Sequence, residues 1–127
     1  MRKVSVIIPI FRVEKFIERC AISLFEQTLD SIEYIFVDDT TPDKSIEILT
    51  DVLERYPQRK PQVTILRHDV NKGLPAARNS GLSVAGGEYV FHCDSDDYLE
   101  SNALEQMLNV AEKTDSDIVW CDYYLSF

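Results

Sequence analysis

The stretch VSVIIPI, residues 4–10, is apolar apart from one serine and is rich in β-branched side chains. A strand with one face in solvent alternates apolar and polar residues, and this stretch does not. Continuous apolar runs are typical of strands buried on both faces, as in parallel sheets covered by helices. The stretch therefore predicts a first strand inside a layered α/β domain.

Apolar runs and amphipathic segments alternate along the rest of the chain. Further strands are expected at residues 34–37, 63–66, 89–93 and 118–121, with residues 123–125 extending the last one. Helices are expected at residues 13–28, 42–56 and 75–85, and around residues 104–111. This order predicts one α/β domain, residues 1–127, with a mostly parallel sheet flanked by helices in a Rossmann-like arrangement.

Cap and turn residues indicate where some of these elements end. Thr41 is the expected N-cap of the second helix, with Pro42 at its first position. Gly86-Gly87 is expected to end the third helix with a left-handed cap. The polar segment PQRKPQ, residues 57–62, is interpreted as a simple connection between a helix and a strand.

The composition argues against several classes of protein. With 127 residues, 45% of them hydrophobic, the chain is long enough to bury a core. Its net charge of −9 disfavours nucleic acid and anionic membrane surfaces as partners. No apolar run reaches the roughly 20 residues that a membrane-spanning helix needs. The N-terminal segment MRKVSVIIPIF lacks a small-residue cleavage site and is interpreted as a strand, not as a signal peptide.

The three cysteines, Cys20, Cys93 and Cys121, each lie within an apolar pattern. They are predicted to be buried free thiols in a reducing compartment. No CxxC or HxxxH spacing supports a zinc site. Trp120 lies in a strand pattern and is expected in the core.

Polar residues gather where the expected strands end. Three carboxylates, Asp94, Asp96 and Asp97, follow the fourth strand, and Asp38-Asp39 follows the second. Two unit charges about 4 Å apart repel by roughly 4 kcal/mol at an effective dielectric near 20, so this crowding needs an offsetting charge. A helix dipole would account for one pair of acids, but ligands of open α/β sheets bind beyond the carboxyl ends of the strands. The acids together predict a shared cleft for Mg²⁺ or Mn²⁺ and substrate phosphates.

Single residues near these strand ends each have an ordinary and a functional interpretation. Phe11 is either a loop hydrophobe or a face on which a flat base stacks. Arg78 is either a solvated helix residue or a contact to a base or phosphate. Gly81 is expected to let its helix approach the sheet closely, and His68 and His92 are interpreted as structural.

Motifs of competing folds are missing from the sequence. The segment after the first strand, IPIFRVEKF, has no glycine, which argues against a dinucleotide-binding site, and there is no P-loop motif. A sugar nucleotidyltransferase would also need a glycine-rich loop there. A phosphatase or receiver domain would place its key aspartate after the first strand, where Pro9-Ile10-Phe11 stands instead.

Three segments of the chain carry a family resemblance: VSVIIPIFRVEKFIERCAISLFEQT, IEYIFVDDTTPDKS and NKGLPAARNSGLSVAGGEYVFHCDSDDYLE. Together they resemble the family-2 glycosyltransferases, which have the GT-A fold, over about residues 3–125. The resemblance implies an enzyme that transfers a sugar from a nucleotide-sugar donor, most often a uridine diphosphate sugar. The implied acceptor is a hydroxyl of a glycan or a lipid-linked molecule, as in cell-surface polysaccharide biosynthesis.

The resemblance also implies roles for particular residues. Asp39 would accept a hydrogen bond from the base, and Asp96 would be the main protein ligand of Mn²⁺ or Mg²⁺, with Asp94 beside it. The implied nucleotide-sugar-binding residues are Pro9, Phe11, Glu14, Asp38, Asp39, Gly73, Arg78, Asp94 and Ser95, and the implied metal ligands are Asp96 and Asp94.

Some positions depart from the common pattern of the family. Phe11-Arg12 stands where Tyr-Asn is usual, Thr40-Thr41 replaces Gly-Ser, and His92-Cys93 replaces a more apolar pair. These departures keep a stacking face but leave the preferred base open.

The chain is shorter than members of the family usually are. The part that would follow supplies the acceptor site and, in inverting members, a carboxylate general base. We therefore expect the donor-binding part of an inverting enzyme, truncated at its C-terminus, with the base beyond residue 127. Asp115, Asp117 and Asp122 follow no motif that would make one of them this base.

Three further expectations follow from this interpretation. The alternative function is a non-catalytic fragment that binds a nucleotide sugar but lacks the acceptor site and the general base. An exposed apolar face left by truncation would favour self-association. The expected location is the cytoplasm, including the inner face of the membrane.

Overall fold

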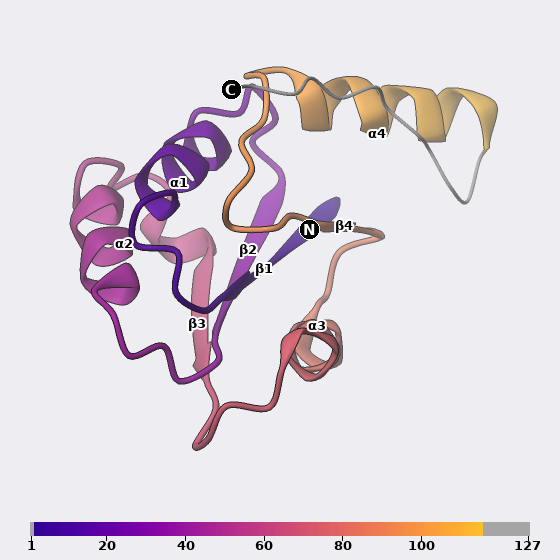
Figure 1. Cartoon of the computed structure of the whole chain (residues 1–127). Coiled ribbons are helices and arrows are strands. Elements are labelled where there is room, and N and C mark those ends of the chain that lie inside the picture. Colours follow the sequence, from indigo (N-terminus) through magenta and orange to yellow (C-terminus); the bar gives the residue numbers. More distant parts are fainter. Residues whose placement is uncertain (1, 116–127) are drawn as a thin grey trace.

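Four parallel strands form one sheet within residues 2–115, which are the residues that the computed structural model describes. The strands are β1 (Val4–Ile10), β2 (Ile32–Asp38), β3 (Val63–Arg67) and β4 (Tyr89–His92), in the order β3-β2-β1-β4. The helices are α1 (Ile17–Phe25), α2 (Ser45–Glu54), α3 (Leu74–Val84) and α4 (Ala103–Thr114), with a short 3-10 turn η1 (Lys60–Gln62). The predicted α/β class with a parallel sheet is confirmed (Figure 1).

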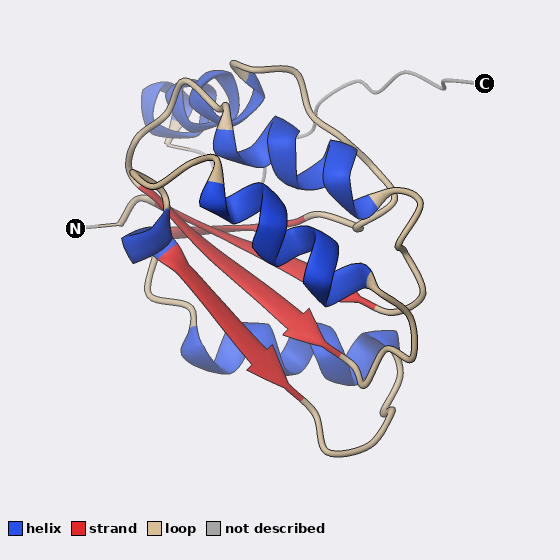
Figure 2. Cartoon of the chain, turned by 90° about the vertical axis from the view of Figure 1, so that its left-hand side faces the viewer, coloured by secondary structure: helices blue, strands red, loops and turns tan. Residues whose placement is uncertain are grey.

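Helices cover the sheet on both faces. Figure 2 shows α1 and α2 side by side on one face and α3 across the other. The larger core lies under α1 and α2, and Leu104 and Leu108 of α4 belong to it. A smaller cluster under α3 is built from Ile7, Ile35, Val37 and Ala77.

β1 lies between β2 and β4, and each of its seven residues is buried, as the apolar run predicts. Its one hydroxyl is satisfied, because Ser5 Oγ donates to Glu33 Oε1 at 2.7 Å and accepts from Gly87 N at 2.9 Å. Pro9 lacks an N–H, but paired residues of β4 end opposite Ile7, so no ladder bond is lost there. The Pro9 carbonyl accepts instead from Ser95 Oγ at 2.7 Å.

Gly81 brings α3 close to the sheet. A Cβ at this position would lie 2.5 Å from Ile7 Cγ2, which is closer than real side chains approach. The prediction that Gly81 permits close packing is therefore confirmed.

The chain reverses its direction of winding at β1. It runs outward from β1 to β2 and β3, and then α3 returns it to β4 on the other side of β1. The carboxyl ends of β1 and β4 therefore form a topological switch point, the place where open α/β sheets bind ligands. The acids that follow β4 lie at this place.

The first two helices begin later than expected. Residues 13–16 form a separate turn, and the side chains of Ser45 and Asp43 accept the backbone N–H groups of Val13 and Glu14. Thr41 and Pro42 do not begin α2 as predicted, because the helix starts at Ser45. Asp43 Oδ1 accepts the Ser45 N–H at 3.1 Å. Hydrogen bonds between two loops therefore hold the turn before α1, whereas a local bond to Asp43 marks the start of α2.

The end of α3 also differs from the prediction. The helix stops at Val84, Ala85 is extended, and neither Gly86 nor Gly87 has a positive φ. Gly87 is needed for a different reason: a Cβ there would lie 2.7 Å from the backbone nitrogen of Ser5. The glycines allow contact with β1 and do not form a left-handed cap.

The segment at residues 57–62 is more than a connection. Arg59 is buried, and its guanidinium donates to the carbonyl oxygens of Phe25, Gln27, Leu29 and Asp30 and to Gln62 Oε1. It also lies 5.6 Å from the centroid of the Tyr34 ring. This one side chain holds the whole turn between α1 and β2.

Cys20 and Cys93 are buried and free, as predicted, and the hydrogen bond between them together with burial raises the pKa of the Cys93 thiol. Cys121, Trp120 and the strand expected at residues 118–121 with its extension lie outside the described residues. Among the described helices, none has the length and apolar character needed to cross a membrane.

We expect Arg59→Met to lower the free energy of unfolding by about 3 kcal/mol or more, because it leaves several buried carbonyl oxygens without a donor. Urea unfolding measures the change. The matched control is Arg55→Met, which removes one exposed ion pair with Glu18 and should cost less than about 1 kcal/mol. Equal effects of the two substitutions would contradict the role of Arg59.

Candidate functional site

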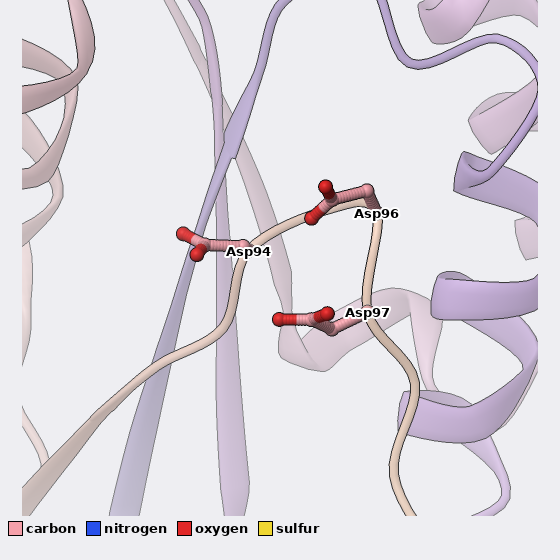
Figure 3. A group of neighbouring side chains, drawn as sticks. All are labelled: Asp94, Asp96 and Asp97. Carbon is pink, nitrogen blue, oxygen red and sulfur yellow. The ribbon is translucent and has the colours of Figure 1, made fainter. Parts of the chain in front are cut away.

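The loop after β4 presents three carboxylates at the switch point. One oxygen from each of Asp94, Asp96 and Asp97 lies within 4.8 Å of the others, and all three residues are exposed. Figure 3 shows Asp96 and Asp97 one above the other on a single turn of the chain, with Asp94 preceding them. The turn is closed by the Asp97 N–H, which donates to the Asp94 carbonyl at 3.0 Å.

The charge of this cluster is only partly offset by protein groups. Arg78 of α3 forms an ion pair with Asp94 Oδ1 at 3.1 Å. Burial, followed by the negative charges of Asp96 and Asp94, raises the pKa of Asp97, and the nearby Arg19 opposes this. A raised carboxyl pKa means that added positive charge would be favourable, and oxygen ligands suit Mg²⁺ or Mn²⁺. The three residues therefore fit a divalent cation.

The same loop is fastened to the end of β1. Cys93 N donates to the Ile7 carbonyl at 3.0 Å, and the buried Ser95 hydroxyl donates to Pro9. Predicted site residues Pro9 and Ser95 are thus in direct contact. Ser95 points into the protein, which leaves its two acidic neighbours facing outward.

A second carboxylate, Asp39, lies at the end of β2 and is 3% exposed. Its Oδ1 accepts from His68 Nδ1 and Lys72 N, both at 2.8 Å, and its Oδ2 accepts from Gly73 N at 2.9 Å and Asn71 Nδ2 at 3.1 Å. A carboxylate offers about four lone-pair positions, and the four protein donors already occupy them. A donor from a ligand would share one oxygen with them.

The electrostatics of Asp39 differ from those of the acids after β4. Burial alone would raise the pKa of Asp39, but the hydrogen bonds from His68, Lys72 and Gly73 outweigh it and hold that pKa below 3.8. Asp39 is therefore a stabilised anion that has its own donors, whereas the acids after β4 lack enough of them.

Of the remaining predicted residues, Phe11 and Glu14 are exposed and Asp38 is buried. Phe11 is 40% exposed, and the Arg12 guanidinium lies 5.3 Å from its ring centroid. Glu14 Oε2 accepts from Lys44 N at 3.1 Å and borders a hollow of about 480 Å³. Asp38 is buried, and its Oδ1 accepts from Thr41 N at 2.9 Å.

Two residues near the carboxyl ends of β1 and β2 have unusual backbone conformations. Arg12 follows β1 with a φ of 55°, and Thr40 follows β2 with a φ of 58°. This region is rare for a β-branched residue, and such strain costs on the order of 1–3 kcal/mol. Thr40 Oγ1 donates to the His68 carbonyl at 2.7 Å, which helps to hold it. The side chain of Thr40 thus supports the unusual conformation of its own backbone.

Hydrogen bonds connect some of the predicted site residues to one another and connect others to residues that were not predicted. It links Asp39 to Gly73, Pro9 to Ser95, and Arg78 to Asp94, but no hydrogen bond described here joins Phe11 or Glu14 to these pairs. The sequence interpretation missed His68, Ser80, Asn71 and Lys72 as supports of Asp39, and it left Asp97 out of the metal ligands. Asp97 could have been found from the run of acids, whereas His68 has no partner nearby in sequence.

The parallel sheet with helices on both faces places the protein in a structural class, the GT-A fold. TarS of S. aureus, residues 1–349, in complex with UDP superimposes with a TM-score of 0.81 at 30% identity, over 91% of this chain and 33% of that one. The mannosyltransferase PcManGT of Pyrobaculum calidifontis, in complex with GDP-Man and Mn²⁺, gives a TM-score of 0.70 at 27% identity, over 77% of this chain and 29% of that one.

Sequence comparison identifies the family. Residues 5–127 match the family described as glycosyl transferase family 2, and the chain belongs to that family. It is 43% identical to the uncharacterized glycosyltransferase EpsJ of Bacillus subtilis over 121 residues, which are 95% of this chain and 34% of that protein. The chain thus spans about a third of the length of this relative.

We expect Asp39→Asn to lower the free energy of unfolding by about 2 kcal/mol at pH 7, because an amide repels two of the four donors that face it. A lowered pKa stabilises the fold above the unfolded-state value near 3.9, and this contribution disappears as the pH falls through the lower folded-state value. Urea unfolding between pH 7 and pH 3 should show the difference from wild type shrinking only below about pH 4. Asp51→Asn, on the exposed face of α2, is the control, and a difference independent of pH would contradict the assignment.

Proposed function

We propose that this chain is the donor-binding part of a glycosyltransferase that uses a nucleotide-diphosphate sugar, with a UDP-sugar favoured. The observation that carries the proposal is the group of three carboxylates at the switch point, in a chain of glycosyl transferase family 2. A divalent cation would offset part of the negative charge of this group and would also bind the diphosphate of the donor.

In this proposal Asp96 and Asp94 hold Mn²⁺ or Mg²⁺, and Asp97 joins them. The bound cation would supply positive charge that stabilises the departing diphosphate. Arg78 lies beside Asp94 and can neutralise one acid or contact a phosphate. The complex of PcManGT with GDP-Man and Mn²⁺ supports the presence of a divalent cation together with the donor.

The nucleoside would lie along the ends of β1 and β2. Phe11 offers an exposed ring for stacking, and Pro9 and Glu14 flank it on the same segment. An N–H of the base would donate to a carboxylate oxygen of Asp39 that also accepts from the protein. Asp38 and Gly73 would lie beside this contact. The UDP complex of TarS supports uridine as the nucleoside.

The proposed reaction is an inverting transfer. The acceptor oxygen bonds to the anomeric carbon, the bond from that carbon to the phosphate oxygen breaks, and the diphosphate leaves with the electron pair. A general base takes the proton of the acceptor hydroxyl. We assign this base to none of residues 2–115, so the alternative is that this chain alone binds the donor without transferring its sugar.

The acceptor is the least specified part of the proposal. A glycan or lipid-linked hydroxyl used in cell-surface polysaccharide synthesis is the proposed class, and a cytoplasmic location that includes the inner face of the membrane stays a prediction. Self-association of the isolated chain also stays a prediction, which light scattering would test.

Isothermal titration with UDP, GDP and dTDP, each with Mn²⁺ and with a chelator, tests the donor site. We expect metal-dependent binding of UDP, which Asp96→Ala and Asp97→Asn should weaken by about tenfold or more, since each removes one charged ligand. Asp51→Ala is the matched control for lost negative charge and should bind like wild type. Binding that is unchanged by the chelator and by Asp96→Ala would refute the metal site.

A pair of exposed phenylalanines tests the position of the nucleoside. Phe11→Ala should weaken UDP binding by about tenfold, because base stacking on an aromatic ring contributes roughly 1–3 kcal/mol. Phe16→Ala removes a ring of similar exposure, 43%, from the neighbouring turn and should leave binding unchanged. Equal losses in the two variants would argue against stacking on Phe11.

A further inference from the structure

A hydrogen-bonded chain runs from Ser80 of α3, which is partly buried, to the buried end of β2. Ser80 Oγ lies 2.7 Å from His68 Nε2, and His68 Nδ1 lies 2.8 Å from Asp39 Oδ1. His68 is 8% exposed and Asp39 is 3% exposed, so water does not compete freely for these bonds. The three residues come from separate parts of the chain and meet at the carboxyl ends of β2 and β3.

The direction of the bonds follows from the chemistry of the groups. The Asp39 carboxylate only accepts, so His68 Nδ1 carries the proton and donates it. In a neutral imidazole Nε2 then accepts from the Ser80 hydroxyl. The backbone of His68 is also fixed, because its N–H donates to the Asp38 carbonyl at 2.9 Å and its carbonyl accepts from Thr40. The ring therefore has one orientation.

Asp39 in turn holds the loop that leads into α3. Its two oxygens accept the consecutive N–H groups of Lys72 and Gly73 and the side chain of Asn71. Gly73 has a φ of 91°, a conformation open mainly to glycine, and it is the N-cap of α3. The position of this loop thus depends on the orientation of one carboxylate.

We infer that His68 and Ser80 are positioning residues of the nucleotide site, which hold Asp39 and the loop at residues 71–73 in the conformation that receives the base. The inference rests on the proposed function for the base. It assigns His68 a task beyond core packing, because the residue is hydrogen-bonded to Asp39, Ser80 and Thr40. Asp39 is one of the residues proposed to contact the base. The acids after β4 share no described hydrogen bond with His68 or Asp39, so the effect should fall on the nucleoside and not on the diphosphate.

Amide hydrogen exchange tests the chain of bonds without any ligand. In His68→Phe, the N–H groups of Lys72 and Gly73 should exchange about tenfold faster or more, while those of Ile7 and Ile35 in the sheet stay protected. In His68→Asn, the amide nitrogen can replace Nδ1 as the donor to Asp39, so most of the protection should return. Unchanged exchange at Lys72 and Gly73 in His68→Phe would overturn the inference.

Binding of two probes in the presence of Mn²⁺ tests the consequence for the site. His68→Phe should weaken UDP binding by about tenfold and Ser80→Ala by about threefold, with inorganic pyrophosphate changed less than about twofold in both. Ser83→Ala, whose hydroxyl donates to the Ser80 carbonyl within the same helix, is the control and should leave both probes unchanged. Equal loss of UDP and pyrophosphate would mean a general structural role and would overturn the inference.

The two experiments separate the inference from the proposed function. If wild type binds neither probe, the donor-site proposal fails, and amide exchange still decides whether His68 controls the loop. If wild type binds UDP but His68→Phe binds it equally well, the donor site stands and the positioning role is wrong.

Discussion

Burial of β1 on both faces is the constraint on which the rest of this protein depends. With α1 and α2 on one side and α3 on the other, the central strand has no place for a charged side chain along its length. Its single hydroxyl needs two partners, and its proline is tolerated only where β4 has ended. Acidic and basic groups near the sheet centre are therefore confined to the strand ends, where the winding reverses and leaves room for a ligand.

The carboxylates at this edge are of two kinds. Asp39 is surrounded by donors, its pKa is lowered, and it organises a loop of the protein itself. The acids after β4 have Arg78 beside Asp94 but leave Asp97 with a raised pKa, so their charge is suited to an added cation. Carboxylates at the ends of two strands of the same sheet thus have opposite electrostatic environments, and the difference is the number of donors around each.

The loops that connect these groups are held by side chains more than by regular structure. Thr41, Asp43 and Ser45 bind the backbone of the turn after β1, and Thr40 is kept at a positive φ by its bond to His68. Arg59 does the same for the turn between α1 and β2 at the opposite end of the sheet. Loops whose backbone is already held by hydrogen bonds lower the ordering cost of binding a ligand at this edge.

The sequence by itself determined the element types, the parallel sheet and the gathering of acids at strand ends, because these depend on the spacing of apolar residues over short windows. It also indicated the roles of Gly81 and of the buried thiols. The tertiary structure alone decided where α1 begins, why Gly87 is a glycine, and what Arg59 and His68 do. Each of these depends on partners far along the chain, such as Asp39 with His68 and Arg59 with Phe25, and local periodicity carries no information about which distant polar groups will meet.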